Sequence, residues 1–140
     1  MSRSPRTVLL DTSVAVAVCT EDHAAHHRGI DAIGDRRVGL AGHAWFETFS
    51  VLTRLPPPQR RAPSEVCTLL RTNFPASSFL SDTAQRAFID ELTLLPIAGG
   101  AIYDALVGLA ARAAQQTLLT RDQRALSTYQ ALGIDIELLS

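Results

Sequence analysis

The chain has 140 residues, of which 46% are hydrophobic and 19% are charged, and its formal net charge is −1. This composition excludes an intrinsically disordered chain and predicts one globular domain, residues 1–140, that is large enough to bury a core. The near-neutral charge lacks the global basic excess that is typical of nucleic-acid-binding proteins.

The first half of the chain alternates short apolar runs with helical patterns. The elements that we predict there are, in order, a strand at 7–11, a helix from Ser13 to about Cys19, a helix at about 24–33, a strand at 38–41 and a helix at 43–55. Ser13 is placed to cap the first helix, Gly34 to end the second, and Pro56 to stop the third.

The second half continues the alternation. We predict a helix at 64–74, a very short strand at 79–80, a helix at 82–94, an alanine-rich helix at 101–115, a strand at 117–120, a helix from Asp122 to Gly133 and a strand at 134–138. Asp82 and Asp122 are placed to cap the helices that they begin. Short apolar strands that alternate with helices predict a three-layer α/β/α fold, with a short central parallel sheet flanked by helices.

Candidate site residues stand at strand ends and in otherwise apolar helices. Asp11 ends the first strand, Asp122 follows the strand at 117–120, and Glu47 and Asp104 lie in helices with few other charges. In open α/β sheets, sites form beyond the carboxyl ends of strands, near the point where strand order switches. We therefore expect the acids to meet there.

Each acid also has a structural role available to it, which the sequence leaves open. Asp122 fits an N-cap, Asp104 fits the positive end of its helix, and Glu47 lies on a polar helix face. Taken together, however, clustered carboxylates would repel one another unless a cation joined them. All-oxygen ligands suit Mg²⁺ or Mn²⁺, which activates water and neutralises charge at a phosphodiester.

Other site chemistries find less support in the sequence. There is no phosphate-binding loop of the GxxxxGK[ST] type and no GxSxG nucleophile motif. Cys19 and Cys67 lack CxxC spacing, so we expect buried, reduced thiols and no thiolate zinc site. No apolar run reaches the roughly 20 residues of a membrane span, and we expect a cytoplasmic protein with no membrane partner.

Four segments in order resemble the PIN-domain family, and within it the VapC-type toxins of toxin–antitoxin pairs. These are residues 8–13 (VLLDTS), 45–52 (WFETFSVL), 103–107 with 110–111 (YDALV, AA) and 118–122 (LLTRD). The resemblance covers nearly the whole chain. It implies a PIN-like fold and a toxin with Mg²⁺- or Mn²⁺-dependent endoribonuclease activity on structured RNA of the tRNA or rRNA class.

The resemblance also implies roles for individual residues. It carries over Asp11, Glu47, Asp104 and Asp122 as metal-binding and catalytic acids, and Thr12, Ser13 and Thr120 as polar residues that support them. It implies a homodimer inhibited by a small VapB-type antitoxin. We further expect Arg112, Arg121 and Arg124 to contact the RNA backbone, although positions on solvated helix faces account for these arginines as well.

Two further functions remain open at this point. The acids of a non-catalytic module would hold a metal or a partner's arginine without cutting any bond. A PIN-type nuclease acting on other nucleic acid, such as DNA or a flap, is the third possibility. A cleavage assay on total RNA, with and without EDTA, separates these functions.

Overall fold

The computed structural model describes residues 6–140. Its elements in chain order are β1 (Thr7–Leu10), α1 (Thr12–Cys19), α2 (His26–Ile33), β2 (Arg37–Leu40), α3 (Ala44–Thr53), α4 (Pro63–Asn73), α5 (Asp82–Glu91), the 3₁₀ turn η1 (Leu92–Leu94), α6 (Ala101–Ala113), β3 (Thr117–Thr120), the 3₁₀ turn η2 (Gln123–Ala125), α7 (Leu126–Ala131) and β4 (Ile136–Leu138). The alternation of strands and helices agrees with the predicted α/β class.

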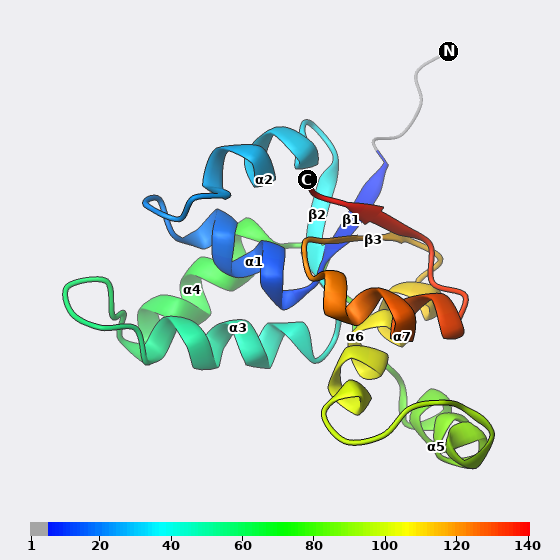
Figure 1. The fold of residues 1–140 in the computed structure, drawn as a ribbon. Helices are drawn as coiled ribbons and strands as arrows, with labels where there is room; N and C mark the ends of the chain where they lie inside the picture. The colour runs from blue at the N-terminus through cyan, green and yellow to red at the C-terminus, as the bar shows by residue number, and fades with distance from the viewer. Residues whose placement is uncertain (1–5) are drawn as a thin grey trace.

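The strands form one parallel sheet in the order β2-β1-β3-β4. The chain runs outward from β1 to β2 and then crosses back to β3 on the other side, so the strand order switches between β1 and β3. A site is expected at the carboxyl ends of these two neighbouring strands. Figure 1 shows them running side by side at the centre of the molecule.

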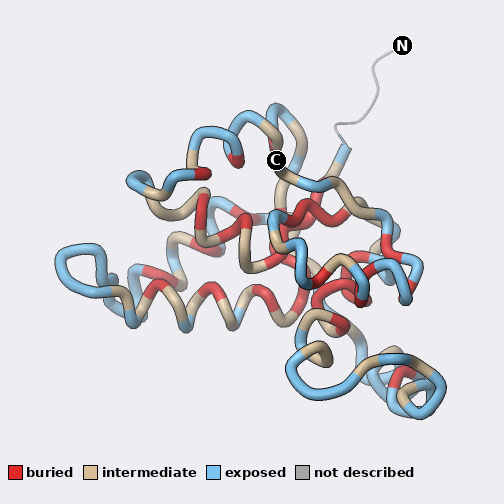
Figure 2. The backbone as a smooth tube through the Cα atoms, viewed as in Figure 1, coloured by how far each residue is buried: buried red, intermediate tan, exposed pale blue. Residues whose placement is uncertain are grey.

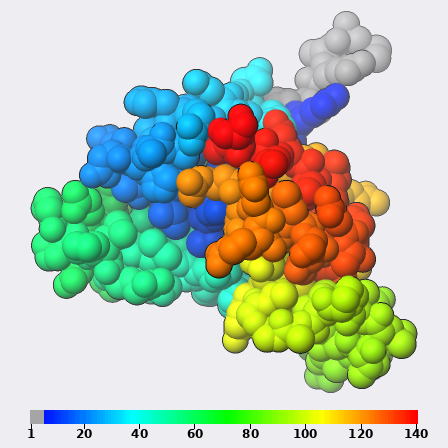
Figure 3. Space-filling model, in the orientation of Figure 1, coloured from blue at the N-terminus to red at the C-terminus, as the bar shows by residue number. Residues whose placement is uncertain are grey.

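Helices cover both faces of the sheet because side chains along a strand alternate between its faces. Val8 and Leu10 pack with α1, α2, α3 and α4, whereas Leu9 packs with α6 and α7 on the opposite side. The tube in Figure 2 is buried along the strands and along the helix sides that face them. Figure 3 shows α5 and the segment that leads to α6 as a lobe at the lower edge.

Most predicted elements are present, and the differences have local causes. The predicted strand at 79–80 is absent, because the chain there makes only one isolated bridge, between Ala41 and Ser78, before Ser81 caps α5. The first helix is capped by Asp11 and not by Ser13, the predicted cap. Ser81 likewise replaces Asp82 as the cap of α5.

Two of the general expectations can be examined in residues 6–140. Cys19 and Cys67 are free and half-buried, and no disulfide joins them. In the same part of the chain, no helix combines the length and apolar character needed to cross a membrane.

Candidate active site at the ends of β1 and β3

Asp11 lies at the point where β1 ends and α1 begins. Its backbone is extended, and its carboxylate accepts a hydrogen bond from the backbone N–H of Val14 at 3.3 Å, as an N-cap does. Only 3% of Asp11 is exposed, because the last three residues of β1 before it and Val14 and Ala15 after it are buried. The sequence thus fixes a carboxylate inside the protein, at the edge of the sheet where a site is expected.

The Asp11 carboxylate accepts hydrogen bonds from four donors. Oδ1 accepts from the Ser13 hydroxyl at 2.5 Å and from the Val14 N–H, and Oδ2 accepts from the hydroxyls of Thr120 and Tyr129, the latter at 3.1 Å. A carboxylate has about four lone-pair positions, so these donors occupy all of them. Burial nevertheless raises the pKa of Asp11, and the hydrogen bonds oppose that rise.

Two of these hydroxyls link Asp11 to the loop that follows β3. Ser13 Oγ accepts a hydrogen bond from the backbone N–H of Arg121 at 3.0 Å, and Thr120 Oγ1 accepts one from the N–H of Asp122 at 3.1 Å. Each hydroxyl therefore accepts a hydrogen bond from the loop backbone and donates one to Asp11. Asp122 is held within the same loop, where its Oδ1 caps η2 through the N–H of Arg124 at 3.0 Å.

Tyr129 is a member of this cluster that sequence reasoning missed. It lies on α7 with only 1% of its surface exposed, and its hydroxyl donates to Asp11. Gly108 on α6 makes room for the ring, because a Cβ there would lie 3.0 Å from Tyr129 Cδ1. Burial and the negative charge of Asp11 raise the pKa of Tyr129, so the hydroxyl stays protonated and remains a donor.

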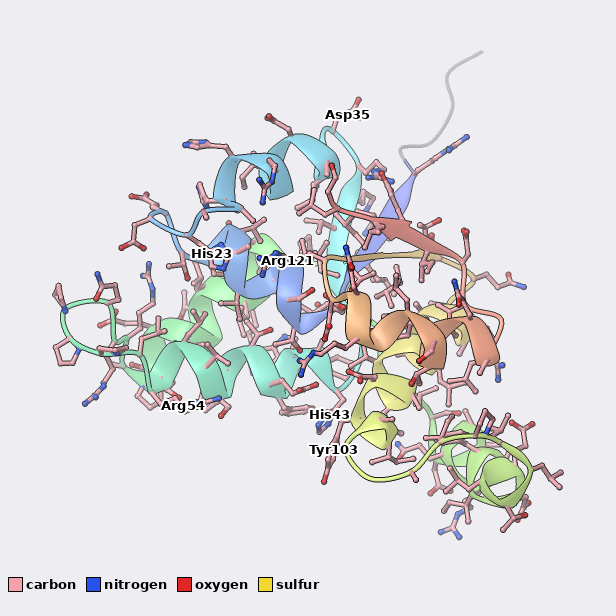
Figure 4. The ribbon with its side chains drawn as sticks, viewed as in Figure 1. His23, Asp35, His43, Arg54, Tyr103 and Arg121 are labelled. Atoms are coloured by element: carbon pink, nitrogen blue, oxygen red, sulfur yellow. The ribbon has the colours of Figure 1, made fainter. Side chains whose placement is uncertain are left out.

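Glu47 and Asp104 come to the cluster from two helix starts. Each lies in the first turn of its helix, α3 and α6 respectively, where the helix dipole favours a negative charge. The His43 and Tyr103 rings stack with centroids 5.3 Å apart and planes inclined by 19°, which joins these two helix starts. Figure 4 labels both residues, which lie one above the other below the N-terminal end of α3 and beside the start of α6.

Electrostatic coupling shows that the acids share one region. Burial raises the pKa of Glu47, the His43 imidazole opposes this, and the charges of Asp104 and Asp11 raise it further. Burial also raises the pKa of Asp104, as do the charges of Asp122 and Asp11. The structure thus brings Asp11, Glu47, Asp104 and Asp122 within reach of one another's charges.

The acidic region suits a hydrated hard cation better than a fully desolvated one. Among residues 6–140, no three His, Cys, Asp or Glu side chains are arranged to hold a metal ion directly. The Asp11 oxygens accept hydrogen bonds from protein donors, and the buried Thr12 hydroxyl lies near Glu47 and lowers the pKa of that carboxyl group. Mg²⁺ usually keeps several waters and takes one or two carboxylates, so this all-oxygen set fits such an ion.

The three predicted RNA-contacting arginines differ in position. Arg121 is exposed beside His23 (Figure 4), and burial together with the charges of Arg121 and Arg28 lowers the pKa of His23. Arg124 points to solvent and pairs with Asp122 at 3.5 Å. Arg112 lies about 12 Å further along α6 than Asp104, at 1.5 Å per residue, and donates to the Leu132 carbonyl at 2.7 Å.

Comparison with known proteins identifies a family model and relatives that are similar in sequence to this chain. The PIN domain family model matches residues 8–131. Ribonuclease VapC40 of Mycobacterium tuberculosis is 46% identical over 132 residues, which cover 93% of this chain and 97% of that protein. Ribonuclease VapC27 of Mycobacterium tuberculosis H37Rv is 42% identical over 127 residues, or 91% of this chain and 93% of the relative.

A solved structure has the same fold. The crystal structure of VapBC2 from Rickettsia felis bound to a DNA fragment from their promoter matches with a TM-score of 0.66. The match covers 96% of this chain and 99% of that chain at 12% sequence identity, so the likeness concerns the fold alone.

Proposed function

The chain belongs to the PIN-domain family as a VapC-type member, and on that premise we propose that it is a divalent-metal-dependent endoribonuclease toxin that cleaves structured RNA of the tRNA or rRNA class. One observation carries the proposal: four carboxylates from distant parts of the sequence share one electrostatic region at the switch point of the sheet. Such a cluster is costly unless a cation balances it.

In this proposal Asp11, Glu47, Asp104 and Asp122 hold Mg²⁺ or Mn²⁺. The bound ion lowers the pKa of water and offsets negative charge at the scissile phosphate. Four protein donors fix the position of Asp11, and one of the hydroxyl donors would turn away when an oxygen of Asp11 binds the ion. Asp104 is the more adaptable ligand, since in the described part of the chain no hydrogen bond lowers its pKa.

The arginines near the acids would bind the RNA backbone. Arg121 directly precedes Asp122, and Arg28 lies close enough to His23 to affect its pKa together with Arg121. The two arginines together have a larger effect on His23 than the opposing carboxylate of Asp22, and this positive excess favours an anion such as a phosphate. The hydrogen bond of Arg112 to Leu132 supports a structural role for that residue, and we leave it out of the proposed RNA contacts.

A cleavage assay with an isosteric variant tests the proposed activity. Purified wild type should cleave total RNA with Mg²⁺ or Mn²⁺ and should be inactive in EDTA. Asp104→Asn removes one charge without a change of shape and should abolish cleavage. Asp90→Asn, at an exposed position on α5, removes the same charge and should cleave like wild type. Metal-independent cleavage, or full activity of Asp104→Asn, would contradict the proposal, and metal binding without cleavage would favour the non-catalytic module.

We also propose a VapB-type antitoxin as the inhibitory partner. The support is membership in the VapC-type group, and the Rickettsia felis structure is one in which a chain of this fold is part of VapBC2. The product of a short neighbouring reading frame should co-purify with the chain and inhibit RNA cleavage at an equimolar ratio. Cleavage that persists in such a complex would argue against inhibition by that partner.

A homodimer is the third part of the proposal. Phe46 and Phe79 are 59% and 53% exposed with ring centroids 6.1 Å apart, and we call them the Phe46–Phe79 patch. An exposed aromatic patch of this kind is typical of protein interfaces. Light scattering should give a dimer for wild type and a monomer for Phe79→Glu.

A further inference from the structure

The stacked His43–Tyr103 pair is built into the two helix starts that carry acids. His43 precedes Glu47 by one turn, and its carbonyl accepts the backbone N–H of Glu47 at 3.1 Å. Residues four apart on a helix have Cβ atoms about 5–6 Å apart, so the imidazole lies on the same side of α3 as the carboxylate. Tyr103 directly precedes Asp104 at the start of α6.

The pair leaves an aromatic surface open to solvent. Tyr103 is 52% exposed, although a large aromatic ring gains free energy when it is buried. The small angle of 19° between the ring planes makes the pair a nearly flat stack that a third flat ring can extend. Figure 4 shows both residues below the N-terminal end of α3 and beside the start of α6, on the side away from the sheet.

We propose that the His43–Tyr103 stack binds an unpaired nucleobase of the RNA, next to the phosphodiester that the acids cleave. Every base has a flat π-face, and proteins that recognise unpaired RNA stack such bases on Tyr, His, Phe or Trp. This inference rests on the proposed ribonuclease function, and it makes that function more specific. The cleaved bond would lie in a loop or bulge of the structured RNA, since a base within a duplex is already stacked.

A neighbouring hollow extends the same surface. It has a volume of about 240 Å³ and is lined by His43, Phe46, Phe79 and Gln85. Gln85 Nε2 donates to the Leu80 carbonyl at 3.2 Å, which orients this amide at the wall of the hollow. An amide is the kind of group that hydrogen-bonds to the edge of a base, so Gln85 is placed to contribute to base preference.

The test is a binding measurement that does not depend on cleavage. The probe is a ten-nucleotide single-stranded oligouridylate with one central 2-aminopurine, whose fluorescence is quenched when it stacks on an aromatic ring. Binding is measured in the Asp104→Asn background with Mg²⁺ present, so that the probe stays intact. Tyr103→Ala should weaken binding by about 5- to 150-fold, since alanine replacement of a stacking aromatic removes about that much affinity.

Two control variants distinguish base stacking from a general loss of apolar surface. Tyr103→Phe keeps the ring and should bind within about twofold of the parent, as should Ile89→Ala, which removes an exposed apolar side chain on α5 that does not line the hollow. Equal affinity of Tyr103→Ala and its parent, failure of Phe to substitute for Tyr, or an equal loss in Ile89→Ala would each overturn the proposal.

A contact between copies of the chain is the remaining alternative for this surface. Light scattering of the same variants detects it, because Tyr103→Ala would then yield monomers while its RNA affinity stayed unchanged, and that result also overturns the proposal. Failure of the ribonuclease proposal is recognised separately. Wild type would then cleave no RNA, although the probe would still bind and quench in a Tyr103-dependent manner.

Discussion

Replacing Tyr129 by phenylalanine should destabilise the protein, even though it removes only one oxygen. The ring is buried and would stay where it is, because the ring carbons that pack against Gly108 are present in phenylalanine as well as in tyrosine. The lost group is the hydroxyl that donates to Asp11 Oδ2 at 3.1 Å. The substitution therefore leaves one lone pair of a buried carboxylate without a partner.

The size of the effect follows from the charge and burial of the acceptor. A buried acceptor left unsatisfied costs about 1–3 kcal/mol, and hydrogen bonds to charged groups lie toward the upper end of that range. For a domain of this length, we convert this cost with the average unfolding entropy per residue and expect a melting temperature lowered by about 3–10 °C. Thermal unfolding followed by circular dichroism, in EDTA at pH 7.5, measures the difference.

The stability difference between wild type and Tyr129→Phe should depend on pH. The Tyr129 hydroxyl lowers the pKa of Asp11, so its contribution to stability requires the charged carboxylate. That contribution is present at neutral pH and is lost as pH falls through the pKa that Asp11 has in the folded protein. The two proteins should therefore melt closer together in acid. A Tyr129→Phe variant that melts with wild type at pH 7.5, or whose deficit grows in acid, would refute this reasoning.

Three other predictions follow from the acids and from the packing of the sheet. Asp104→Asn should raise the melting temperature of the metal-free protein at pH 7.5 and have no effect near pH 3. The reason is that burial and neighbouring charges raise the pKa of Asp104, so its ionisation is unfavourable in the folded state. A lower melting temperature at pH 7.5 would contradict this prediction. Millimolar Mg²⁺ or Mn²⁺ should stabilise wild type in a melting experiment and stabilise Asp11→Asn less, and an equal gain in both would show that the ion binds elsewhere. Gly39→Ala should prevent normal folding, because the added Cβ would lie 2.1 Å from the backbone carbonyl carbon of Ala76. Soluble yield and circular dichroism measure this effect. A normally folded variant would show that the backbone at Ala76 can move aside.

Hydrophobic periodicity and strand-end acids carried much of the fold prediction. The run at 7–10 and the run at 117–120 are strands in the structure, and the placement of Asp11 and Asp122 just after them anticipated which strand ends would meet. Parallel pairing is the reason that this works. Neighbouring parallel strands end at the same edge of the sheet, so residues that follow them come together although the sequence separates them widely.

The remaining features depend on tertiary packing that the sequence does not display. Tyr129 stands in the middle of a short helix, where an aromatic residue is typical of the core, and its partner Asp11 is 118 positions away. The prediction of a strand at 79–80 rests on a two-residue apolar run, whereas Phe79 is exposed in the structure. The Thr12 hydroxyl, which the family resemblance assigns to support of the acids, is buried and lowers the pKa of Glu47, a contact between residues 35 positions apart in the sequence.

The geometry of the acids is tied to the register of β1 against β3. Leu10 pairs with Leu119, and the Asp11 N–H donates to the Leu119 carbonyl at 3.2 Å, which sets Asp11 beside Thr120. A slip of one residue would turn Leu119 to the other face of the sheet and separate the Thr120 hydroxyl from Asp11. Burial of Leu10 and Leu119 in the core opposes such a slip. The packing that stabilises the sheet therefore also holds Asp11 and Asp122 together, so core substitutions at these leucines should impair metal binding through register as well as through stability.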